Sequence, residues 1–288
     1  MSPLELFAVQ RLARAAAELG HYNLGKLLNA AVTSLTNRSL AAESLPKTDR
    51  ELAEAIAGLE PALHQADLDP QLLVAIQRAR EIMAAGNLIL SDDAPPVWVC
   101  RVCGEVVVHS LPDHCPQCGA GTLVFQYFSP AFYLEPEPIP NVMTQLARTT
   151  DWLDATLAGL SAEQMTRRVD GTEGAWSLHE AAGHLLDSQH LIAQRVQLFM
   201  EQATPHLDAR ATWQTIESAR LSAAEIATEF RLSREAMLTQ LRSLPADQWA
   251  RLGHHIEFGP VTLQQQCTYF AKHEHWHMAQ MTRIRRSL

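Results

Sequence analysis

The feature that most constrains this chain is a pair of Cys-x-x-Cys motifs near its middle. Eleven residues separate the two pairs, Cys100/Cys103 and Cys115/Cys118. A glycine follows each pair, at Gly104 and Gly119. A Cys-x-x-Cys-Gly turn wraps the backbone around one metal ion, and the glycine supplies the positive φ that this turn needs. Four thiolates at this spacing predict a closed tetrahedral site for zinc or iron.

Two disulfides are the competing interpretation of the same cysteines. We favour the metal, because only five cysteines occur in 288 residues and the N-terminal segment lacks the pattern of a secretory signal. Reduced thiols suit the cytoplasm, where we expect the protein to be located. The fifth cysteine, Cys267, lies in a helical pattern and is expected to be a small buried apolar residue. No apolar run is long enough for a membrane span, so we expect no membrane partner.

The charge distribution argues against a nucleic-acid partner. The formal net charge is −9, and Arg101 is the only Arg or Lys between residues 95 and 134. Nucleic-acid binding depends on clustered positive charge that neutralises phosphates. We therefore expect the cysteine motifs to form a structural or redox module and not a nucleic-acid reader.

The composition predicts a mainly α protein, since 47% of the residues are hydrophobic and only 6% are aromatic. Two proline-containing segments, 91–96 and 135–140, read as linkers. They divide the chain into a helical domain (1–90), a small β ribbon with the four cysteines (95–130) and a helical bundle (139–288). In the first domain we expect helices over 4–40, interrupted at Gly20, and over 49–60 and 70–90, with Pro61 as a break.

Short apolar runs predict the strands of the ribbon at Val97–Val99, Val106–Val108 and Leu123–Phe125. In the third domain, hydrophobic periodicity and capping signals predict four helices. The first covers about 141–159. The others start at the caps Ser177, Ser222 and Thr262 and extend to about 202, 243 and 286. Four helices of this length predict a four-helix bundle.

The last of these helices contains a histidine motif. His273 and His277 are four residues apart, so they share one helical face and can bind the same ion. Gln280 extends this face by one turn, whereas His275 points to a different side. His254 and His255 precede the helix in a loop that could rim the pocket, and we expect them to be loop surface and not ligands.

A third metal ligand has to come from another helix, and His184 is the candidate. An apolar stripe flanks it, which places it near the core side of the second bundle helix. Three imidazoles would leave a coordination position open, as in catalytic zinc sites. Asp187, one turn later, could orient an imidazole or a metal-bound water.

These residues resemble the DinB / YfiT-like superfamily of four-helix-bundle metalloenzymes. The family pattern is one His on helix two and His-x-x-x-His on helix four, commonly with a Gln three residues later. His184, His273, His277 and Gln280 match it, as does the Trp176-Ser177 capping turn. The resemblance implies a divalent metal, zinc or nickel. It also implies a small-molecule substrate and, in several members, a low-molecular-weight thiol such as bacillithiol or mycothiol as partner.

The cysteine ribbon is similar to the rubredoxin-like domain of rubrerythrins, in Trp98–Gly104, Cys115–Gly119 and Phe125. It departs from that domain at Glu105, where an aromatic residue is usual. Residues 17–31 also share a short similarity with a rubrerythrin helix. The Glu-x-x-His that would bind a di-iron centre is absent beyond it, because residues 35–38 offer no ligand for iron.

We therefore expect a divalent-metal-dependent enzyme, a thiol-dependent transferase or a hydrolase, with its open metal site in the bundle. A non-catalytic metal-binding scaffold is the first alternative. A rubrerythrin-like redox or stress protein with iron at the cysteines ranks below it, because the di-iron ligands are absent. A homodimer is kept as a candidate assembly.

Overall fold

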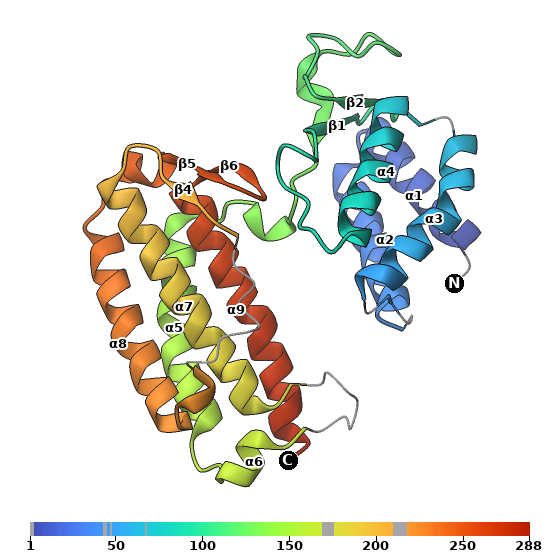
Figure 1. Ribbon diagram of the computed structural model, residues 1–288. Coiled ribbons are helices and arrows are strands. Elements are labelled where there is room, and N and C mark those ends of the chain that lie inside the picture. Colours follow the sequence, from blue (N-terminus) through green and yellow to red (C-terminus); the bar gives the residue numbers. More distant parts are fainter. Residues whose placement is uncertain (1–2, 43–44, 47, 67, 169–175, 210–217) are drawn as a thin grey trace. The chain divides into compact units, whose positions relative to one another are not determined.

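The structure is a computed structural model that describes residues 3–42, 45–46, 48–66, 68–168, 176–209 and 218–288. The predicted mainly α fold is confirmed, and two compact units divide it, Met1–Glu60 and Pro61–Leu288 (Figure 1). The boundary between the units lies inside the segment 1–90, for which one helical domain was expected. The division into three domains remains a prediction. Among the described residues, none of the helices combines the length and the apolar character of a membrane span.

The first unit is built on a helical hairpin of α1 (Pro3–Glu18) and α2 (Tyr22–Ala42). The chain reverses at Gly20, whose φ of 83° lies in the left-handed region that favours glycine. The two helices pack closely at Gly25, where an added Cβ would come within 3.0 Å of the Ala13 carbonyl oxygen. Ala13 and Ala16 are buried at this contact.

The prediction that Pro61 ends a helix is wrong, because α3 (Asp49–Gln65) continues through it. Proline removes only its own N–H bond, and the helix resumes with Ala66 N–H bonded to the Ala62 carbonyl oxygen. Helix α4 (Pro70–Ala84) starts as expected. The Asp69 carboxylate caps it by accepting from the backbone N–H groups of Gln71 and Leu72.

The cysteine ribbon is a three-stranded antiparallel sheet in the order β2-β1-β3. Its strands are β1 (Val97–Cys100), β2 (Val106–Val108) and β3 (Phe125–Tyr127). The first two lie where they were predicted, but the third starts two residues later than predicted. The cause is Thr122, whose hydroxyl donates to the carbonyl oxygens of Pro112 and Asp113 and holds η1 (Thr122–Val124) as a 3₁₀ turn.

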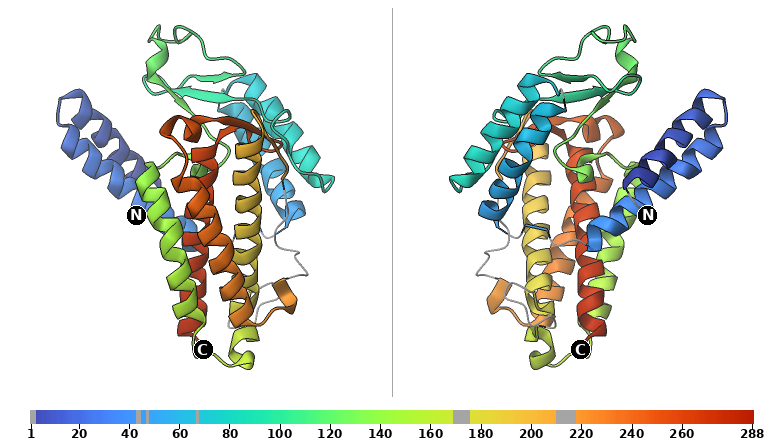
Figure 2. Two further views of the ribbon diagram at one scale, coloured as in Figure 1. Left: turned by 90° about the vertical axis from the view of Figure 1, so that its left-hand side faces the viewer. Right: turned by 90° about the vertical axis from the view of Figure 1, so that its right-hand side faces the viewer.

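The predicted four-helix bundle is confirmed. Its helices are α5 (Ile139–Leu157), α7 (Leu178–Glu201), α8 (Ala223–Arg242) and α9 (Leu263–Arg286). Helix α7 packs against α8 and α9, and α5 packs against the same two helices, so these four run side by side (Figure 2). The short α6 (Ala162–Thr166) packs on α7. Ser177, Ser222 and Thr262 form the three capping boxes at the starts of α7, α8 and α9.

A small sheet at one end of the bundle was not predicted. Its strands are β4 (His206–Leu207), β5 (Leu252–His255) and β6 (Gly259–Thr262), in that order. β5 and β6 form a hairpin that leads into α9, and β4 pairs with β5 in parallel. Residues 253–259, which were expected to form a loop, therefore belong to an ordered hairpin.

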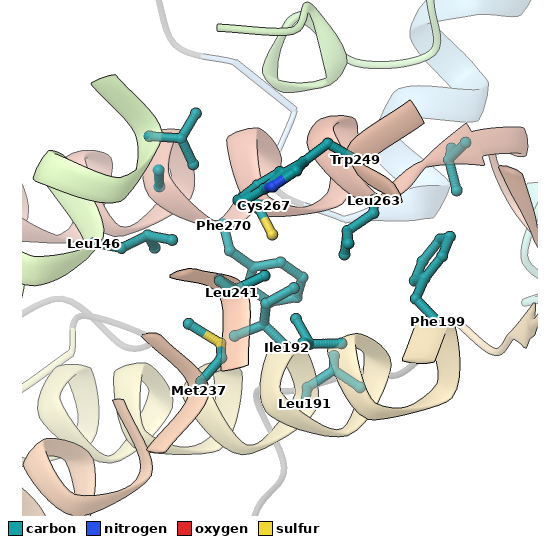
Figure 3. Close-up of a cluster of buried hydrophobic side chains, with 14 of the residues drawn as sticks. Leu146, Leu191, Ile192, Phe199, Met237, Leu241, Trp249, Leu263, Cys267 and Phe270 are labelled. Atoms are coloured by element: carbon teal, nitrogen blue, oxygen red, sulfur yellow. The ribbon is translucent and has the colours of Figure 1, made fainter. Parts of the chain in front are cut away.

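The apolar core of the bundle fills the space between the four helices (Figure 3). Leu146 of α5, Ile192 of α7 and Met237 of α8 are almost fully buried there. Cys267 of α9 lies among them with no exposed surface, which confirms its predicted role as an apolar residue. Burial raises the pKa of its thiol to about 12, so it stays protonated at neutral pH.

Candidate metal centres

Three histidines from two helices of the bundle meet at one point. The Nε2 atom of His273 lies 3.2 Å from that of His184 and 3.1 Å from that of His277. In a tetrahedral zinc site with Zn–N bonds of 2.0–2.1 Å, the nitrogen atoms are about 3.3 Å apart. The three ring nitrogens present here therefore fit a metal ion, and the predicted ligand candidates come together.

Neighbouring side chains fix the orientation of these rings. Nδ1 of His277 lies 2.8 Å from the Gln280 side-chain oxygen. Because that oxygen only accepts, we assign the proton to Nδ1, which leaves the Nε2 lone pair for a metal. The Trp176 ring stacks on His277 at a centroid distance of 5.6 Å and meets the His184 ring edge-on at 5.0 Å. Gln280 and Trp176 thus hold the ligands in place.

The rings of His273 and His277 are neutral at physiological pH. Burial lowers the pKa of His273 to about 3, with further lowering from the neighbouring His277 and His184. Burial also lowers the pKa of His277, against an opposing effect of Gln280 and Glu274. Neutral imidazole is the form that binds a metal ion.

The remaining candidates of the bundle lie outside this cluster. Asp187 accepts a hydrogen bond of 2.8 Å from the Ser218 hydroxyl, and its expected role beside the metal stays a prediction. His275 is exposed on another side of α9, and His190 is exposed on α7.

A cavity of about 70 Å³ adjoins the histidine cluster and shares His273 with it. Its other polar walls are Ser188 and Arg195 of α7, His255 and Glu257 of the β5–β6 hairpin, and Tyr269 of α9. Burial raises the pKa of both Glu257 and Tyr269, while the positive charge of Arg195 acts against it in each. The cavity is thus a small polar space with one buried cation.

His255 lines the cavity, as expected for a segment that could rim the pocket, but the expectation that it lies on a loop surface is wrong, because only 2% of it is exposed. Its Nδ1 accepts from the backbone N–H groups of Glu257 and Phe258, both at 3.2 Å. Its Nε2 lies 3.0 Å from Nη2 of Arg195. The pairing of β5 with β4, a contact between distant parts of the sequence, buries this residue.

The four cysteines of the ribbon also come together. The Sγ atoms of Cys100 and Cys118 are 3.8 Å apart, and those of Cys103 and Cys115 are 3.6 Å apart. Zn–S bonds of about 2.3 Å in a tetrahedron give S···S distances of about 3.8 Å, so these thiols fit a single metal ion. As predicted, the glycine after each pair has positive φ, 91° at Gly104 and 74° at Gly119.

The thiols of the ribbon differ in pKa, because hydrogen bonds among them favour the thiolate form of one and disfavour that of another. Burial raises the pKa of Cys100, but the backbone N–H groups of Cys103 and Val102 and the neighbouring thiols lower it to about 7. For Cys103, the N–H of Glu105 lowers the pKa, while burial and the three other thiols raise it to about 12. All five cysteines are free thiols, so no disulfide competes for these ligands.

Comparison with known proteins supports both resemblances. Residues 145–281 match the DinB superfamily. This range contains all three histidines and Gln280. Residues 98–126 match the rubredoxin-like domain of rubrerythrin.

One curated relative and one solved structure extend the comparison. The uncharacterized protein YuaE of Bacillus subtilis (strain 168) is 25% identical over 157 residues, which are 49% of this chain and 94% of YuaE. YfiT from Bacillus subtilis is described as a probable metal-dependent hydrolase with an unusual four-helix bundle topology. Its structure covers 55% of this chain and 92% of its own, with 19% identity and a TM-score of 0.48.

Several residues of the DinB-like bundle escaped the sequence reasoning, although helical spacing could have identified them. Tyr269 and Gln266 precede His273 by four and seven residues on α9, so they share its face. Ser188 and Arg195 follow His184 by four and eleven residues on α7, again on one face. Ser188, Arg195 and Tyr269 line the cavity, so its α7 and α9 walls belong to the same helix faces that carry the histidines.

Proposed function

We propose that the bundle is a divalent-metal site, for zinc or nickel, that supports transferase or hydrolase chemistry on a small-molecule substrate. The observation that carries this proposal is the convergence of three Nε2 atoms beside a polar cavity, with those of His184 and His277 within 3.2 Å of that of His273. Three protein ligands leave a coordination position for a substrate or a water. When bound, the metal lowers the pKa of a thiol or water at that position and so supplies a nucleophile at neutral pH.

The residues of the chain supply position and environment. His184, His273 and His277 would hold the ion, and Gln280 fixes the tautomer of His277. Trp176 covers the rings of His184 and His277 with an apolar surface, which limits the access of water. A low-molecular-weight thiol is the proposed co-substrate of the transferase reaction, since thiolates are good ligands of zinc and nickel.

Metal analysis of the purified protein tests this proposal. We expect His273→Ala to lose the metal of the bundle and to keep the metal of the ribbon. His275→Ala is the matched control, because His275 lies two residues away on the same helix but is exposed. Mass spectrometry gives the metal content per chain for each variant. If His273→Ala and His275→Ala retain the same content as the original protein, the proposed site is wrong.

The four-cysteine ribbon supports a second candidate function. Its four Sγ atoms have the spacing of a tetrahedral site, and its sequence matches the rubredoxin-like domain of rubrerythrin. Iron in such a site transfers electrons, whereas zinc there is structural. If the ribbon is a redox centre, the purified protein is expected to be red, with charge-transfer bands that a reductant bleaches. A colourless protein with zinc at the cysteines would exclude this function and leave the ribbon as a structural module.

A further inference from the structure

One wall of the cavity beside the histidine cluster carries a half-buried carboxylate. Glu257 lies in the turn between β5 and β6 and lines the same space as His273. Within the part of the chain that the structure describes, no group donates a hydrogen bond to this carboxylate or forms an ion pair with it. Its oxygens are therefore open to hydrogen bonds from a molecule in the cavity.

Tyr269 shows that Glu257 lies close to the metal site but outside it. The Tyr269 ring stacks on the His273 ring at a centroid distance of 6.1 Å. The charge of Glu257 adds to the effect of burial in raising the pKa of Tyr269, so the carboxylate and the phenol are neighbours. Among the described residues, the possible ligand atoms that lie within 4.8 Å of one another belong to the three histidines and not to Glu257. We therefore expect a molecule bound to the metal to lie between the ion and this carboxylate.

The carboxylate next to His273 in the sequence is not available to such a molecule. His273, Glu274 and His277 have the His-Glu-x-x-His spacing of metalloproteases, in which the glutamate accepts a proton from the metal-bound water. Here both oxygens of Glu274 bind the guanidinium group of Arg234 in the core of the bundle. Another group has to accept the proton, and Glu257 is the one carboxylate among the described walls of the cavity.

The environment of Glu257 also suits a group that takes up a proton. Burial raises the pKa of its carboxyl group, against a lowering effect of the positive charge of Arg195. The rise brings the pKa closer to neutral pH. A proton acceptor is most effective when its pKa lies near the pH at which it operates.

We infer that Glu257 accepts the proton of the nucleophile, a water or a thiol, that binds in this cavity beside the metal site. The O–H or S–H bond of that molecule breaks, its electron pair stays on the oxygen or sulfur, and the proton moves to a carboxylate oxygen of Glu257. The carboxylic acid then gives the proton to the leaving group, which regenerates the carboxylate. This inference adds a catalytic residue to the function proposed above and rests on it.

Isothermal titration calorimetry with acetohydroxamic acid tests the inference on the full-length, zinc-loaded protein at pH 7. This small acid is neutral in solution and binds a metal ion as its anion, so it gives up a proton on binding. Titrations in phosphate and in Tris, which differ in their heats of ionisation, yield the number of protons released to the buffer. We expect about zero protons per bound molecule for the original protein, in which Glu257 takes up the proton, and about one for Glu257→Gln.

Two further variants control for charge and for folding. Glu229→Gln makes the same change at an exposed position of α8 and should release as few protons as the original protein. Glu257→Asp keeps a carboxylate and should also retain the proton. If Glu257→Gln does not hold zinc, the original protein and Glu257→Asp decide, and release of about one proton by the original protein overturns the inference.

The titrations also separate this inference from the proposed function. Equal proton release by the original protein and Glu257→Gln, with binding that His273→Ala abolishes, overturns the role of Glu257 alone. Binding of acetohydroxamic acid that persists in His273→Ala, or that is absent from the zinc-loaded original protein, overturns the proposed function and this inference with it.

Discussion

At the scale of single residues, burial decides what each histidine of the bundle can do. His184 and His277 are buried against Trp176 with their Nε2 atoms facing His273, which suits metal binding. His255 is buried as a hydrogen-bond acceptor beside a cation, which keeps its ring neutral. The local spacing of His273 and His277 identified these two, and His184 was added from its apolar surroundings and from the family pattern. These signals missed His255, because a strand from elsewhere in the chain buries that residue.

The environment of His255 predicts a pH dependence of stability. Burial, with smaller effects of Arg195 and His254, lowers its pKa from 6.5 to about 4. The unfolded chain therefore binds a proton below pH 6.5 that the folded chain accepts only near pH 4. The contribution of His255 to the free energy of unfolding is complete above pH 6.5 and is lost progressively as the pH falls from 6.5 to about 4. The difference corresponds to on the order of 3 kcal/mol of unfolding free energy.

Urea unfolding of the metal-free protein at pH 7 and pH 5 measures this effect. His255→Asn offers a side-chain oxygen for the N–H groups of Glu257 and Phe258 but does not titrate. We expect its loss of stability between the two pH values to be smaller than that of the original protein. His190→Asn, at an exposed position, should leave the loss unchanged. An equal loss in all three proteins would contradict the assignment.

At the scale of the elements, a buried ion pair joins all four helices of the bundle. Arg234 of α8 and Glu274 of α9 are almost completely buried and bonded to each other. Arg234 also donates to the Gln189 side-chain oxygen of α7 at 2.6 Å and to the Leu146 carbonyl oxygen of α5 at 2.5 Å. Glu274 directly follows the metal-ligand candidate His273 on α9, so this network anchors the ligand-bearing helix.

Removing one member of this pair is expected to cost more than removing both. Arg234→Met leaves the Glu274 carboxylate buried without its partner, which typically costs about 3–5 kcal/mol. The double variant Arg234→Met/Glu274→Leu should recover part of that loss, because no unpaired charge remains. Chemical denaturation measures both. Arg231→Met, which breaks an exposed pair, should change stability by about 1 kcal/mol or less. A double variant less stable than Arg234→Met alone would disprove this account.

The elements themselves were largely predictable, because their signals are local. Ser177, Ser222 and Thr262 each cap a helix through bonds to a residue three positions away. The network around Arg234 was not predictable, since a charged residue in a helical pattern usually lies on the surface. The β4–β5–β6 sheet was missed for a related reason: β4 has only 2 residues, and it pairs across 48 residues with β5.

At the scale of the whole molecule, the chain carries two candidate metal centres of different construction. The ribbon takes all its ligands from a stretch of 19 residues, Cys100 to Cys118, so its sequence pattern alone identifies it. The bundle takes His184 from one helix and His273 and His277 from another, and the match to a family pattern was needed to join them. The predicted homodimer remains a prediction.

The separation of the bundle ligands along the chain has a mechanical consequence. His184 and His273 are 89 residues apart, and α8 and the β5–β6 hairpin lie between them. An ion bound to both would act as a reversible cross-link that closes this long loop. The unfolded chain does not keep the site together, so binding stabilises the folded bundle by mass action, by about 2.7 kcal/mol when the free metal is at 100 times its dissociation constant. The metal would therefore stabilise the folded bundle, and the lifetime of the folded protein would increase with the concentration of available metal.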